Sequence, residues 1–220
     1  MNTFTQNKWL LALVVALGMH SSAWALDDAG AQRLLSIQQR WAEVQYNTPE
    51  KQRAAEFEKL AAQTLAFTAE KPEAAEAWIW NGIVVSSWAG AEGGLGALGK
   101  AKQSKASLEK ALQLDPAALQ GSAYTSLAAL YDRVPGWPIG FGDSDEAQTL
   151  LKSALALNPN GIDSLYFWGD HLYREGQYPE AKAALLKAKL AAPRPGRELA
   201  DEGRRRDIDA LLKDVEHKLN

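Results

Sequence analysis

Apolar residues recur three and four positions apart along most of the chain, a spacing that places them on one face of an α-helix. In the last such segment Ile208, Leu211 and Val215 form one stripe, and charged residues occupy most other positions. This pattern predicts an all-α protein. The expected helices span residues 28–46, 50–69, 73–88, 102–114, 118–132, 144–157, 162–175, 179–190 and 199–219.

Small and large residues follow a fixed order between two prolines. Pro159 and Pro193 lie 34 residues apart, which is the length of one helical hairpin in a family of stacked repeats. A small residue such as Gly169 or Ala181 lets two antiparallel helices approach, while large neighbours fill the space around the contact. Pro193 ends the second helix because proline cannot continue one. The ordered positions are Leu165, Trp168, Gly169, Leu172, Ala181, Leu185, Ala188 and Pro193.

This segment resembles the tetratricopeptide (TPR) repeat family, and the same order of residues occurs twice upstream, ending at Pro116 and Pro159. The two upstream units are longer than the family pattern, and we expect the extra residues, 89–100 and 134–142, to lie between the helices of each hairpin. The resemblance implies an all-α, TPR-like α-solenoid of stacked helical hairpins. Its expected parts are an N-terminal hairpin over 28–70, repeats over about 75–118, 119–161 and 162–195, and a capping helix over 199–219 with a polar outer face.

The N-terminal residues have the pattern of a secretory signal peptide. Lys8 precedes an apolar run over residues 9–19, and Ala23 and Ala25 have the small-x-small form of a signal-peptidase site. The run is too short to span a bilayer as a helix. We therefore expect cleavage after Ala25, a single mature domain over 26–220, and a periplasmic or secreted location with no membrane attachment; an uncleaved anchor is the alternative.

Composition narrows the possible chemistry. The formal net charge is −3, with no basic excess, which argues against nucleic acid as a partner. The chain has no cysteine, which excludes disulfides, thiolate metal sites, a cysteine nucleophile and a lipid-modified N-terminal cysteine. His171 and His217 are expected on exposed helical positions, too few for a zinc site that needs three or four ligands. We expect no metal, no cofactor and no catalytic residues, so the protein is predicted not to be an enzyme.

Two local patterns have both a functional and a plain structural interpretation. Gly94, Gly96 and Gly99 match a dinucleotide-binding glycine pattern, but the strand–turn–helix context that this pattern needs is missing. We expect these glycines to let the insertion pack closely on a neighbouring backbone. The run over 204–206 is three arginines, which we expect on a solvated helix face; an anion or partner contact is the alternative.

The resemblance places a candidate binding surface on the concave face, which the first helix of each hairpin lines in this family. Arg133, Tyr166, Tyr173 and Arg174 could bind an extended peptide or an acidic group there. The face lacks the lysine and asparagine set with which some members clamp a terminal carboxylate, and a merely solvated face is the alternative. The positions carried over are Glu76, Ile79, Ile83, Ser122, Thr125, Ala129, Asp132, Arg133, Asp163, Tyr166, Asp170, Tyr173 and Arg174.

The second candidate surface is the loop over 134–142, which is rich in proline, glycine and aromatic residues. Loops on a rigid scaffold often carry function, so Trp137 and Phe141 could form a docking surface. The same side chains could instead fold down as a plug over the core. The sequence leaves both possibilities open.

The predicted function is that of a periplasmic scaffold that binds another protein or peptide through its concave face or its inserted loops. The alternative is an accessory component of solute uptake that holds a small solute, because the long insertions resemble those of the TRAP-transporter T-component family. Without a lipid-anchor cysteine, the chain departs from that second pattern. The candidate partner-binding residues are Asp132, Arg133, Trp137, Phe141, Tyr166, Asp170, Tyr173 and Arg174.

Overall fold

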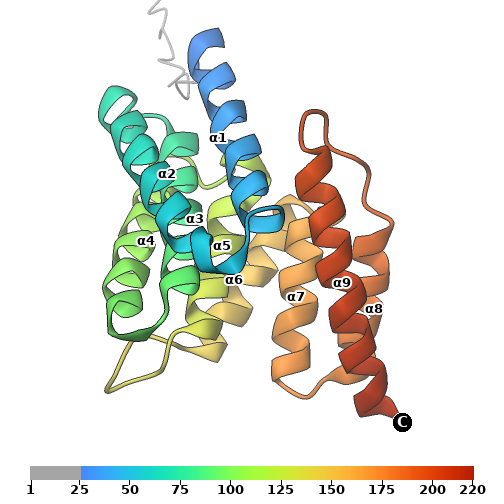
Figure 1. Ribbon diagram of the computed structural model, residues 1–220. Coiled ribbons are helices and arrows are strands. Elements are labelled where there is room, and N and C mark those ends of the chain that lie inside the picture. The colour runs from blue at the N-terminus through green and yellow to red at the C-terminus, as the bar shows by residue number, and fades with distance from the viewer. Residues whose placement is uncertain (1–25) are drawn as a thin grey trace, which may run out of the picture.

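A computed structural model describes residues 26–220, so the expected signal peptide lies outside the described residues. This part of the chain is all-α and contains no strand, which confirms the expected solenoid (Figure 1). Its helices are α1 (Asp28–Tyr46), α2 (Glu50–Glu70), α3 (Ala75–Glu92), α4 (Gly94–Leu114), the 3-10 turn η1 (Ala118–Gly121), α5 (Ser122–Arg133), α6 (Ser144–Leu157), α7 (Ile162–Arg174), α8 (Tyr178–Lys189) and α9 (Glu198–Leu219).

Consecutive helices pack as antiparallel hairpins, α3 on α4, α5 on α6 and α7 on α8. Two of these hairpins contain the same close contact. A Cβ added to Gly82 would lie 2.6 Å from Cγ of Leu108, and one added to Gly169 would lie 2.7 Å from Cγ of Leu185. Both glycines therefore allow a leucine of the second helix to reach the backbone of the first, as the repeat pattern predicts.

The region over 89–100 differs from its sequence-based prediction. Instead of an insertion between two helices, it extends α3 to Glu92 and begins α4 at Gly94. Gly93 and Gly94 make the turn with φ of 64° and 62°, a conformation that favours glycine. The glycines do not pack on a neighbouring backbone either: an added Cβ at Gly94 or Gly99 would meet no atom within 4 Å, and one at Gly96 would meet only the side chains of Glu92 and Lys100.

The C-terminal helix also differs from a simple cap. α9 packs on α8, as expected for the end of a stack, but it also contacts α7 and the N-terminal helix α1. In Figure 1 the blue α1 lies at the top centre of the molecule, and the red α9 lies to its right beside α7 and α8. The contact is close because Gly203 of α9 lies directly against the ring of Tyr46 of α1. The solenoid is thus curved enough for its two ends to meet.

Arg204 contradicts the expectation that the arginine run lies on a solvated face. Its residue surface is only 9% exposed, and its guanidinium lies 4.4 Å from the ring centroid of Tyr166. Arg206, two positions on, is exposed and pairs with Glu202, as the prediction had it. The buried face of α9 is therefore wider than its apolar residues alone indicate.

The glycine contact between α7 and α8 gives the first testable prediction. Gly169→Ala forces Leu185 to move, and overpacking of this kind costs roughly 1–3 kcal/mol of the free energy of unfolding. Gly99→Ala is the matched control, since it lies within α4 with open space around it and should gain roughly 0.5–1 kcal/mol. Urea unfolding followed by circular dichroism measures both. Equal effects of the two substitutions would contradict the packing role of Gly169.

Candidate functional site

The concave side of the solenoid contains a cavity of about 1220 Å³ that is partly open to solvent. Its walls come from α1, α3 and α5, from the start of α7, and from residues 191–197 ahead of α9. Because α9 contacts α1, the cavity has walls from both ends of the described chain. Sites of this form are where proteins most often hold ligands.

One wall of the cavity is aromatic. Trp41 of α1 and Trp80 of α3 meet edge to face with ring centroids 6.0 Å apart. The Trp41 indole Nε1–H donates to Oγ of Ser87 over 2.8 Å, which fixes the ring orientation. Phe57 and Phe167 also line the cavity. Such rigid rings offer a large apolar contact area at a low cost in conformational entropy.

The polar part of the lining holds five side-chain amides, and none of them makes a hydrogen bond in the part of the chain that the structure describes. Each amide can both donate and accept, so together they can pair with the N–H and C=O groups of a ligand. They come from α1, the α4–α5 connection and the turn before α7. They are Gln38, Gln45, Gln120, Asn158 and Asn160.

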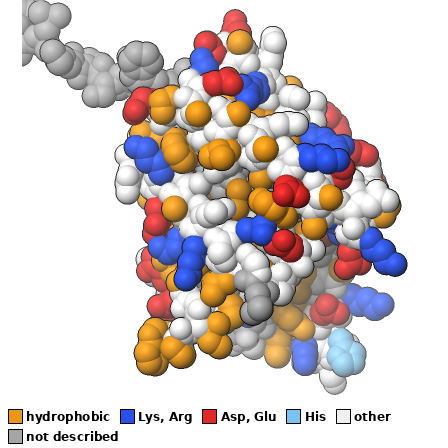
Figure 2. All heavy atoms as spheres, turned by 60° about the vertical axis from the view of Figure 1, so that its left-hand side comes forward, with side chains coloured by type: hydrophobic (Ala, Val, Ile, Leu, Met, Phe, Trp, Pro, Cys, Tyr) orange, Lys and Arg blue, Asp and Glu red, His pale blue; other side chains and the backbone are white. Residues whose placement is uncertain are grey.

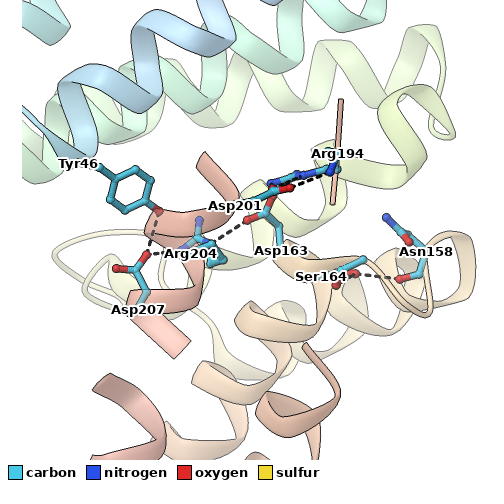
Figure 3. A network of polar contacts seen from close by, with 9 residues as sticks. Tyr46, Asn158, Asp163, Ser164, Arg194, Asp201, Arg204 and Asp207 are labelled. Atoms are coloured by element: carbon cyan, nitrogen blue, oxygen red, sulfur yellow. Dashed lines mark hydrogen bonds and ion pairs between the residues drawn. The ribbon is translucent and has the colours of Figure 1, made fainter. Parts of the chain in front are cut away.

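Charged residues form the end of the cavity nearest α9, and Asp163 is their centre (Figure 3). Its Oδ1 accepts from Nε of Arg204 over 2.8 Å, and its Oδ2 accepts from Nη1 of Arg194 over 2.7 Å. Arg194 also donates from Nε to Oδ1 of Asp201 over 2.7 Å. Burial by itself would raise the pKa of Asp163, but the two guanidiniums hold it well below its usual range.

The same network ties the N-terminal helix to α9. Arg204 donates from Nη1 to Oδ2 of Asp207 over 3.1 Å, and the Tyr46 hydroxyl donates to the same oxygen over 3.0 Å (Figure 3). Burial raises the pKa of Tyr46, so this hydroxyl keeps its proton at neutral pH. A chain of polar contacts therefore runs from α7 through α9 to α1.

The structure places only part of the predicted concave face on the cavity. Ile79 is fully buried, and Asp170 lies beneath Arg133 and Arg174, accepting from Nη2 of Arg133 over 2.9 Å. Tyr166 lies under the guanidinium of Arg204, and Tyr173 packs on Tyr178. Predicted residues that line the cavity are Ile83, Ser122, Thr125, Ala129, Arg133 and Asp163, whereas Glu76, Ile79, Asp132, Tyr166, Asp170, Tyr173 and Arg174 do not.

His171 was expected on an exposed helical position, and this prediction is wrong. Its side chain is 1% exposed, stacks on Trp168, and has Nδ1 3.0 Å from Oδ1 of Asp132. Burial raises the pKa of Asp132 against the lowering effect of His171. His217, near the end of α9, is exposed as expected. The His171–Asp132 pair joins α7 to α5 and so belongs to the contact between two repeats.

The two interpretations of the loop over 134–142 apply to different parts of it. Trp137 is 90% exposed at its tip. Phe141 instead packs edge to face on Tyr131 with ring centroids 5.5 Å apart. Pro135 and Ile139 line the cavity, so the loop forms part of its rim. The docking interpretation thus fits the tip, and the plug interpretation fits its C-terminal end.

Arg197 and Trp80 are residues of the cavity that the sequence analysis missed. Arg197 follows the Pro193–Gly196 turn, which reads only as a connection between helices. Its guanidinium lies 5.0 Å from the ring centroid of Trp80 in α3. No repeat pattern could have found it, because the pair is 117 residues apart in sequence and lies outside the hairpin contacts.

Two segments of the chain match family models, both described as tetratricopeptide repeat, at residues 139–200 and 95–117. Among solved structures, a thermophilic TPR protein from Thermus thermophilus is similar with a TM-score of 0.55 and 19% sequence identity. The alignment covers 84% of this chain and 96% of that one. This similarity supports the TPR-like fold, and a search of curated proteins found no significant match.

Two further features of residues 26–220 bear on the chemistry. Within this range no helix has the length and apolar character needed to cross a membrane. The same residues include no group of three or more His, Cys, Asp or Glu side chains placed to hold a metal ion.

The Asp163 network gives the second prediction. Asp163→Asn leaves two guanidiniums facing a neutral amide, and we expect a loss of roughly 1–3 kcal/mol of unfolding free energy at pH 7. Because the folded-state pKa of Asp163 lies below its unfolded value, its stabilisation is present above about pH 4 and is lost as the pH falls further. The stability gap between wild type and variant should therefore narrow on acidification.

Thermal unfolding between pH 7 and pH 2.5 measures this dependence. Asp214→Asn is the control, because Asp214 is an exposed carboxyl on α9 with no ion-pair partner among the described residues. A gap between Asp163→Asn and wild type that stays constant down to pH 2.5 would contradict the assigned role of the carboxylate.

Proposed function

We propose that this protein is an exported scaffold that binds an extended segment of another protein inside its concave cavity. The observation that carries the proposal is the cavity itself, with aromatic rings on one wall and five unpaired amides around it. Tetratricopeptide repeats commonly serve as protein-binding surfaces, which supports a protein as the partner.

The size and chemistry of the cavity favour a peptide. Its volume of about 1220 Å³ exceeds the usual range for small-molecule sites, roughly 300–1,000 Å³. An extended peptide has an N–H and a C=O at every residue that helices or strands do not already satisfy. Amides such as Gln38, Gln45 and Asn160 can pair with these groups, while the Trp41 and Trp80 rings take apolar side chains.

The outer surface has fewer features that could bind a partner than the cavity has. On the face shown in Figure 2, hydrophobic side chains lie scattered among charged side chains of both signs. The most exposed large apolar residues, Trp137, Leu190 and Ile139, lie on the loop before α6 and at the end of α8. We assign Trp137 a contact with the part of the partner outside the cavity, because its loop forms the cavity rim. Arg133 is the predicted site residue that reaches the interior.

Export is part of the proposal and rests on the sequence pattern before Leu26. The basic residue, the apolar run and the two small residues at Ala23 and Ala25 support it. We expect the mature protein to begin at Leu26 when it is isolated from its own cells. N-terminal sequencing tests this, and retention of Met1 would contradict it.

A second candidate function is the holding of a small solute for an uptake system. The cavity, with its aromatic wall and its arginines, favours this candidate as well. Native mass spectrometry of the protein from its own cells separates the two functions. A bound mass of a few hundred daltons supports the solute, and a bound mass of protein size supports the scaffold.

The third prediction tests the cavity as the binding site. Peptides are selected from a displayed library of random twelve-residue sequences on the wild-type protein. Ala129→Trp places a large ring inside the cavity, and we expect at least a tenfold loss of affinity for the selected peptides. Ala183→Trp is the control, because Ala183 is exposed on α8 and does not line the cavity. Equal affinity in both variants would place binding elsewhere.

A further inference from the structure

We infer that Arg197 and Trp80 anchor a carboxylate of the bound segment, an aspartate or glutamate side chain with apolar neighbours. The inference deepens the proposed function and rests on it. It names the chemical feature by which the cavity would recognise its partner and the two side chains that would read that feature.

Arg197 is an arginine without a protein partner. Its guanidinium makes no ion pair or hydrogen bond with the described part of the chain, and its Nε is buried without an acceptor. It lines the main cavity and also a smaller one between α1 and α9. A guanidinium has five N–H donors in a fixed fork. Because no protein group accepts from Arg197 in the described part of the chain, its donors remain available to a ligand.

The neighbouring arginines show that this lack of a partner is specific to Arg197. Arg194 and Arg204 line the same end of the cavity, and the fold provides both with the carboxylate of Asp163. Arg133 likewise has Asp170. Burial, and then the positive charge of Arg194, lowers the pKa of Arg197 to about 10, so it is still charged at neutral pH in surroundings that disfavour the charge. A bound anion would relieve that cost.

Trp80 adds a second unpaired donor at the same place. The residue is 4% exposed, yet its indole Nε1–H has no acceptor in the described part of the chain. Its ring supports the guanidinium of Arg197 at 5.0 Å, a cation–π contact that holds the fork in position. Buried polar groups in proteins are almost always paired. Two unpaired donors on side chains in contact therefore indicate a missing acceptor.

A carboxylate fits this pair better than a phosphate group does. It carries one negative charge and two coplanar oxygens that match the guanidinium fork. A phosphate would need more positive charge, and the nearest other cations, Arg194 and Arg204, are already neutralised by Asp163, Asp201 and Asp207. The cavity lining also includes the apolar side chains of Trp41, Ile83 and Ala200, which favours apolar residues beside the acid.

The test uses the displayed peptide library on the full protein and on two variants. Arg197→Gln removes the proposed anchor. Arg206→Gln is the matched control, because it removes the same charge from α9 at an exposed position outside the cavity. We expect peptides selected on wild type to share an acidic residue at one position beside apolar residues. Peptides selected on Arg197→Gln should lack it, while those selected on Arg206→Gln should keep it.

A double-mutant cycle separates anchoring from a structural role. On wild type, changing the shared acid of a selected peptide to its amide should weaken binding at least tenfold. On Arg197→Gln the same peptide change should cost less than twofold. We also expect Arg197→Gln to unfold at the same temperature as wild type or higher, because it removes a half-buried charge that has no ion-pair partner among the described residues.

The other outcomes are distinct. Selected peptides without a shared acid, or an additive cycle, would overturn the role of Arg197 and leave the proposed function standing. Failure to select any peptide would overturn the proposed function itself. If octanoate binds in an Arg197-dependent way while no peptide does, the carboxylate comes from a small organic acid, and the peptide source inferred here is wrong.

Discussion

The carboxylate of Asp163, held between the guanidiniums of Arg194 and Arg204, is the interaction on which the shape of this molecule depends. Charges that are partly removed from water are costly unless each finds partners in good geometry. Here both carboxylate oxygens are used, and Asp201 and Asp207 complete the arrangement. Such a network is satisfied in one relative placement of α7 and α9 only, so it fixes the angle at which the last helix leaves the stack.

The placement of α9 gives the concave face of the stacked hairpins the walls of a cavity. With α9 set against α7, Gly203 meets the ring of Tyr46, and α1 closes on the C-terminal helix. The segment over 191–197 then lies across the concave face and brings Arg197 onto Trp80. The repeats supply one wall of aromatic and small residues, and the chain ends supply the charged end of the cavity. The proposed binding chemistry therefore lies where the two ends of the solenoid meet.

Within single hairpins the sequence was a good guide. Gly82 and Gly169 lie against Leu108 and Leu185 as the repeat order predicts, since contacts between neighbours in sequence follow from residue size and period. The predictions from sequence that were wrong have local causes. The glycines over 89–100 suggested a loop, yet helix occupies this region on both sides of the turn at Gly93, because a glycine inside a helix costs only about 1 kcal/mol. His171 appeared to be a surface residue because its partner, Asp132, belongs to the preceding repeat.

The sequence by itself determined the all-α class, the stacked hairpins and the positions of most helices, because hydrophobic period, small residues and prolines act over one or two turns of chain. It also offered Arg133 as a residue of the concave face, and the cavity includes it. Only the tertiary structure decided that the ends meet, that Arg204 is buried and that Arg197 is left without a partner. These outcomes depend on how curvature accumulates over several repeats and on which carboxylates reach which arginines across large separations in sequence, and no local pattern encodes either.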